Sequence, residues 1–191
     1  MRRMRFVILT LLLGFGSTVD VACADDAANA WKALRAGSHV ALMRHADAPG
    51  GVGDPPGFRV DDCATQRNLS EKGRADAAKI GARLKREGIA FEKILSSPWC
   101  RCIDTAKLMN LGTVETEATF GNVVVLRDQR DALAAGARAL IAKWNGPSNL
   151  LVVTHGANIA ALTTISPASG EIVVVRGGGG SVESVGRLLL D

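Results

Sequence analysis

Asn149–Thr154 (NLLVVT) decides the fold class, because its apolar core has the length of a single buried strand. His155-Gly156 follows it, and Ala157–Ile165 then has the pattern of a helix. His39–Met43 (HVALM) is a second apolar run of the same kind. Short apolar runs that alternate with helical patterns predict an α/β fold, in which helices flank a sheet.

The rest of the chain continues this alternation. Ser70 is a suitable N-cap for a helix that runs up to Gly88 with an apolar stripe of alanine, isoleucine and leucine. Asp47–Arg67 is a long loop rich in Gly, Pro and Asp, and loops of this length are often functional. The other expected elements are a strand at Lys93–Ser96, helices at Trp99–Met109 and Asp128–Trp144, and a closing hairpin of Glu171–Arg176 with Val182–Leu190.

The first 24 residues have the three-part layout of a secretory signal. Arg2, Arg3 and Arg5 precede the apolar run Phe6–Phe15, and Ala22-Cys23-Ala24 offers small residues for cleavage. The run is shorter than the ~20 residues that span a bilayer, which disfavours the alternative of a retained anchor. We therefore expect a signal peptide at 1–24, a single domain at 25–191, and a periplasmic or secreted protein without a membrane span.

The net charge and its distribution argue against a nucleic-acid partner. Cleavage after Ala24 removes three arginines and Asp20, which lowers the formal charge from +4 to +2. The remaining basic residues are scattered, with few aromatic residues between them, so a nucleic-acid partner is not expected.

Two of the three histidines follow predicted strands. His45 comes after HVALM as Arg44-His45, and His155 comes directly after NLLVVT. Ligands in open α/β sheets bind beyond the carboxyl ends of the strands, so we expect the two imidazoles to meet at one site. Arg44 and Arg101 would bind phosphate oxygens there. A neutral imidazole beside them suits in-line attack on phosphorus, whereas His39 begins its strand and is expected to be structural.

Four motifs in order resemble the histidine phosphatase superfamily, the phosphoglycerate-mutase-like proteins. They are LMRHADAP, RNLSEKGRADAAKIGARL, SSPWCRCIDTA and VVTHGANI, and they extend from about Val40 to Ile159. The resemblance implies a three-layer α/β sandwich with a mostly parallel central sheet and a phosphohistidine intermediate. It implies no metal and no organic cofactor.

By motif match, the resemblance makes His45 the nucleophile, with Arg44, Arg101 and His155 forming the phosphate pocket. Arg67 is a further candidate for that pocket. His155-Gly156 differs from the His-Asp of the acid phosphatase and phytase branch, which is therefore disfavoured. In the other branch a loop glutamate donates the proton. Glu117 has the matching Glu-x-x-Phe-Gly spacing, although it fits a solvated loop residue equally well.

The cysteines predict a disulfide in an oxidising compartment. Cys100 and Cys102 lie two apart on a predicted helix and point to different sides, so only one of them is expected to reach Cys63. Three free thiols are the alternative. A metal site is disfavoured, because there is no CxxC and the histidines lack ligand spacing.

The leading functional hypothesis is a phosphomonoester hydrolase acting on a small or exposed phosphate, such as a sugar phosphate or an envelope component. A phosphate mutase and a non-catalytic phosphate-binding module are the alternatives. We expect a monomer or a weak dimer.

Overall fold

The computed structural model describes residues 19–178 and 181–190. Within them, six strands form one sheet in the order β3-β2-β4-β1-β5-β6. The pairs β3–β2, β2–β4 and β4–β1 are parallel, whereas β5 runs antiparallel to both of its neighbours. The mostly parallel sheet is therefore confirmed. The strands are β1 (Val40–Arg44), β2 (Phe91–Ser96), β3 (Val114–Thr116), β4 (Asn149–Thr154), β5 (Ile172–Gly178) and β6 (Ser181–Leu188).

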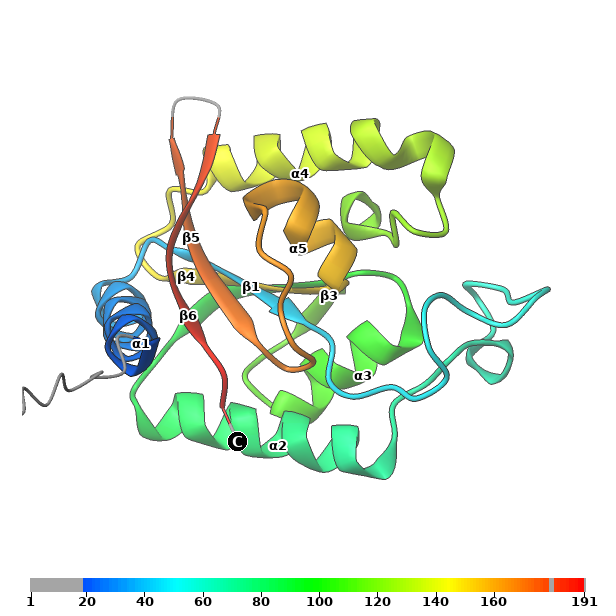
Figure 1. The fold of residues 1–191 in the computed structure, drawn as a ribbon, viewed down its shortest axis with the longest axis horizontal. Helices are drawn as coiled ribbons and strands as arrows, with labels where there is room; N and C mark the ends of the chain where they lie inside the picture. The colour runs from blue at the N-terminus through cyan, green and yellow to red at the C-terminus, as the bar shows by residue number, and fades with distance from the viewer. Residues whose placement is uncertain (1–18, 179–180, 191) are drawn as a thin grey trace, which may run out of the picture.

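Helices cover both faces of the sheet, which gives three layers (Figure 1). One face carries α1 (Val19–Ala36), α2 (Glu71–Arg86) and α3 (Cys100–Met109). The other carries α4 (Arg130–Lys143) and α5 (Gly156–Thr163). Among the described residues, no helix is long and apolar enough to cross a bilayer.

The central strands supply both cores, because successive side chains point to opposite faces. On β4, Leu151 and Val153 pack toward α1–α3, while Leu150 and Val152 pack toward α4 and α5. All four side chains are fully buried. This explains why NLLVVT is apolar without alternation: a strand buried on both faces needs apolar residues in each direction.

The start of α2 lies where the sequence predicts it. Ser70 caps this helix by accepting a hydrogen bond from the backbone N–H of Gly73 at 2.9 Å. Helix α3 likewise follows β2 directly, so the segment SSPWCR turns from the sheet into a helix at the carboxyl end of its strand.

Two elements were not expected from the sequence. The short edge strand β3 is one, and α1 is the other. Helix α1 packs closely on β6, where a Cβ on Gly186 would lie 2.7 Å from the backbone nitrogen of Ala30. Most of the predicted signal segment lies outside the described residues, and Ala22–Ala24 belongs to the backbone of α1.

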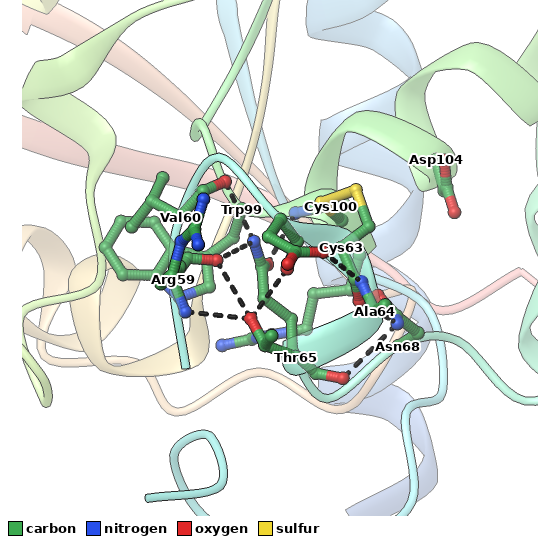
Figure 2. Close-up of a disulfide and its surroundings, with 12 residues drawn as sticks. Arg59, Val60, Cys63, Ala64, Thr65, Asn68, Trp99, Cys100 and Asp104 are labelled. Atoms are coloured by element: carbon green, nitrogen blue, oxygen red, sulfur yellow. Dashed lines mark hydrogen bonds between the residues drawn. A yellow bond between two sulfur atoms is a disulfide. The ribbon is translucent and has the colours of Figure 1, made fainter. Parts of the chain in front are cut away.

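A disulfide joins Cys63 to Cys100, which selects one of the two predicted pairings. Figure 2 shows it linking the 3-10 turn Cys63–Thr65 to the first residue of α3. Cys102 is a buried free thiol. The bridge therefore ties the far end of the long loop after β1, which extends away from the sheet in Figure 1, to the start of α3.

Candidate active site

Adjacent parallel strands bring the two histidines together. Arg44, the last residue of β1, is paired with Thr154, the last residue of β4. The backbone N–H of His45 donates to the carbonyl oxygen of Thr154 at 2.9 Å. The rings of His45 and His155 consequently meet edge to face, with their centroids 5.6 Å apart. The predicted convergence at the carboxyl edge of the sheet is confirmed in geometry.

His45 presents one specific nitrogen. Its Nδ1 lies 2.8 Å from the carbonyl oxygen of Ala46. A carbonyl oxygen only accepts, so Nδ1 carries the proton and Nε2 keeps its lone pair. Burial lowers the pKa of His45 to about 3, and the charges of Arg101, Arg67 and Arg44 act in the same direction. The ring is therefore neutral and nucleophilic at neutral pH.

His155 is fixed by residues that sequence reasoning did not single out. Ser97 Oγ lies 2.9 Å from its Nε2, and the ring meets Trp99 edge to face at 5.5 Å. Burial and the charge of Arg101 hold the pKa of His155 well below its ordinary value. The second serine of the SSP segment was the available signal, since it directly follows a strand beside β4.

Three arginines line one cavity of about 330 Å³ together with His155. They are Arg44, Arg67 and Arg101, so the further candidate Arg67 joins the two predicted ones. Within the described part of the chain, the rest of the wall is uncharged and contains no aspartate or glutamate: Gly51, Val52, Gly53, Asn122, Val124, Gly156, Ala157, Ala160, Ser166 and Pro167. A site with three guanidinium groups and no lining carboxylate is suited to an anion.

Gly156 makes room for Arg44. A Cβ at position 156 would lie 3.3 Å from Arg44 Cδ, so a larger residue would crowd the guanidinium arm. Arg44 Nη1 is anchored by the carbonyl oxygen of Pro167 at 2.9 Å. The glycine after the second histidine, noted in the sequence as a departure from the His-Asp branch, thus has a packing reason.

The long loop delivers Arg67 to the cavity. Arg67 Nε donates to the carbonyl oxygen of Gly53 at 2.8 Å, and its Nη1 donates to that of Ala48. The side chain thus holds the two halves of the loop together. The Cys63–Cys100 disulfide fixes the same segment four residues earlier.

Glu117 does not reach the cavity, which corrects the proton-donor hypothesis. Its carboxylate turns back to cap the 3-10 turn Ala118–Phe120, accepting from the backbone N–H of Thr119 at 2.9 Å and from its hydroxyl at 2.7 Å. These bonds lower the pKa of Glu117, whereas a general acid needs a raised one. The spacing matched, but local capping determines the direction of this side chain.

His39 lies at the opposite end of β1, where its Nδ1 contacts the carbonyl oxygen of Gly37 at 2.6 Å, as expected for a structural residue. In the part of the chain that the structure describes, no three His, Cys, Asp or Glu side chains gather so as to hold a metal ion. The assembled groups are thus a neutral imidazole, a second buried imidazole and three arginines.

Comparisons with known proteins agree with this geometry. The model of the histidine phosphatase superfamily (branch 1) matches residues 40–122. No curated protein matches the chain.

Solved structures share the fold. The protein histidine phosphatase SixA complexed with tungstate is 20% identical with a TM-score of 0.54, covering 78% of this chain and 96% of its own. A mycobacterial glucosyl-3-phosphoglycerate phosphatase is 20% identical with a TM-score of 0.51, covering 80% and 96%. The product of a Mycobacterium tuberculosis open reading frame is 18% identical with a TM-score of 0.59, covering 80% and 96%.

The family match contains the first histidine and the arginine segments, and the shared fold places the second histidine beside them. Residues 40–122 thus match the histidine phosphatase superfamily (branch 1), and solved structures of phosphatases share the fold of the chain.

Proposed function

We propose that the protein is a phosphoric monoester hydrolase that works through a phosphohistidine on His45. The observation that carries the proposal is the hydrogen bond from His45 Nδ1 to the Ala46 carbonyl, which leaves Nε2 unprotonated. His45 itself does not line the arginine cavity, but its ring packs against His155, which does. An imidazole in this state attacks phosphorus without first losing a proton.

The reaction has two steps. His45 Nε2 forms a bond to phosphorus while the bond from phosphorus to the leaving group breaks, and the leaving group departs with the electron pair. Arg44, Arg67 and Arg101 offset the charge on the equatorial oxygens. Water then attacks the phosphohistidine, the N–P bond returns its electron pair to Nε2, and inorganic phosphate leaves as H2PO4⁻ with both protons of the water.

The leaving group is the distinguishing feature of the substrate. Among the described residues that line the cavity there is no carboxyl group to serve as a general acid for a poor leaving group. This favours small or exposed phosphoryl compounds whose leaving group departs readily, such as aryl phosphates and phosphoramidates. Phosphohistidine belongs to the second class, and SixA, which shares the fold, is a protein histidine phosphatase.

The two alternatives fit less well. A phosphate mutase must retain its intermediate while that molecule reorients, and the export proposed here takes the protein away from glycolysis. A binding module without catalysis has no need of an imidazole with a free Nε2. We also propose that the protein acts after export, because the Cys63–Cys100 disulfide favours an oxidising compartment.

The test uses the chain from Asp25 onward with 4-nitrophenyl phosphate, with and without a chelator. We expect turnover that the chelator leaves unchanged, and its abolition in His45→Ala. Rapid quench should trap acid-labile phosphate on His45.

Glu117→Gln is the matched control and should keep wild-type rates on both aryl and alkyl phosphates, because Glu117 lies outside the cavity. Wild-type activity in His45→Ala would refute the proposal.

A further inference from the structure

A buried carboxylate lies against the phosphate pocket without lining it. Asp54, on the long loop, contacts Arg101 through both of its oxygens, at 2.6 Å to Nη1 and 3.2 Å to Nη2. Both side chains are 0% exposed. Because an unpaired buried guanidinium would be costly, Asp54 provides the counter-charge that allows Arg101 to lie beneath the cavity before any phosphate arrives.

Two further donors fix the same carboxylate. Trp99 Nε1 donates to Oδ2 at 3.0 Å, and the backbone N–H of Arg67 donates to Oδ1 at 3.2 Å. Burial opposes ionisation of Asp54, but the hydrogen bond and the charge of Arg101 outweigh it and lower its pKa. Asp54 is therefore an anion held from three sides, and it is unsuited to donate a proton.

The pairing leaves one edge of Arg101 without a partner. Both terminal nitrogens are engaged, Nη1 by Asp54 and the Arg67 carbonyl oxygen, and Nη2 by Asp54. The remaining nitrogen, Nε, is buried and has no hydrogen-bond partner. Leaving a buried donor unpaired is costly, and Arg101 lines the anion cavity, so a ligand oxygen that reached this nitrogen would satisfy it.

We propose that Asp54 is a positioning residue, which grips Arg101 by its two terminal nitrogens so that the Nε–H is presented to a phosphoryl oxygen. This inference rests on the proposed function in taking the cavity as the phosphoryl site. The contrary arrangement, in which Asp54 competes with phosphate for Arg101, would require the ligand to displace a carboxylate that four hydrogen bonds retain.

Calorimetry with inorganic phosphate tests the inference without relying on turnover. Asp54→Asn should weaken phosphate binding about tenfold or more, because a guanidinium freed from its counter-charge loses its orientation. Arg101→Gln should also weaken it, and the double variant should bind no more weakly than Arg101→Gln alone, since Asp54 acts through Arg101. Asp61→Asn, an exposed carboxylate of the same loop, is the matched control and should bind as wild type.

Asp54→Glu is a second variant in case Asp54→Asn does not fold, because it keeps the negative charge. It should also weaken phosphate binding, since its longer side chain displaces Arg101. Equal or tighter phosphate binding by the folded Asp54 variants would overturn the inference in favour of competition. If Asp54→Asn weakened phosphate binding by the same factor in the Arg101→Gln variant as in wild type, Asp54 would have a general structural role and the inference would be overturned. Wild-type protein that binds phosphate without turnover would refute the hydrolase and leave this measurement valid.

Discussion

At His45, one backbone hydrogen bond and the loss of solvent determine which nitrogen is reactive and in which charge state. Its place after a strand was predictable from the sequence, as were those of Arg44 and His155. The contact of Ser97 with His155 and that of Asp54 with Arg101 were not predicted. The first depends on which strand lies beside β2, and the second depends on the path of the long loop. Local patterns encode neither, and the Glu117 spacing shows that a matching motif does not fix where a side chain points.

Burial of His45 makes stability depend on pH. Its pKa is about 3 in the folded protein, and about 6.5 in the unfolded chain. Below pH 6.5 the unfolded state binds a proton that the folded state does not, so the free energy of unfolding falls as pH falls. For this group the loss is about 2 kcal/mol between pH 7 and pH 5.

Urea unfolding at the two pH values checks this prediction. Between pH 7 and pH 5, the free energy of unfolding of His45→Gln should fall by about 2 kcal/mol less than that of wild type. His39→Gln, at the other end of β1, is the control and should behave as wild type. If the stability of His45→Gln depended on pH as that of wild type does, His45 would not be buried in its neutral form.

At the scale of elements, long apolar or well-capped segments were predictable and short or polar ones were not. NLLVVT matches β4 residue for residue, and Ser70 caps α2. Strand β3 has three residues, too few for a periodic pattern, and among the described strands it pairs with β2 alone. Helix α1 escaped prediction because it buries a narrow stripe, including Ala30, Ala33 and Leu34, among charged residues next to the signal segment.

Removal of the disulfide should have a measurable effect on the free energy of unfolding. Cys63 and Cys100 are separated by 37 residues, and closing a loop of that length stabilises the fold by about 3 to 4 kcal/mol in chain-entropy models. Cys63→Ser/Cys100→Ser should lower the free energy of unfolding by up to this amount. Peptide mapping without reduction should identify the bridge in wild type.

Cys102→Ala serves as the control and should keep the crosslink. Burial raises the pKa of the Cys102 thiol to about 12, so alkylation should reach it only after unfolding. Equal unfolding midpoints for wild type and the double serine variant would contradict the stabilising role of the bridge.

At the scale of the whole molecule, export and the packing of α1 are compatible. In α1, Asp26 and Ala30 contact Gly186 of β6, and both residues follow Ala24, so cleavage after Ala24 would keep these contacts. We expect mass spectrometry of protein from its native host to find Asp25 at the amino terminus. Chains with and without residues 1–24 should then unfold at the same temperature. A full-length chain in the cytosol would contradict the localisation.

The parallel pairing of β1 with β4 joins segments 110 residues apart along the chain. Its other neighbour, β5, is synthesised later still. During synthesis β1 therefore has both edges unpaired until most of the domain exists, and pairing across such a separation is slow. The two histidines meet only at that stage. The proposed phosphate binding would thus report completed folding, and a chain truncated before Asn149 would retain His45 without the second histidine.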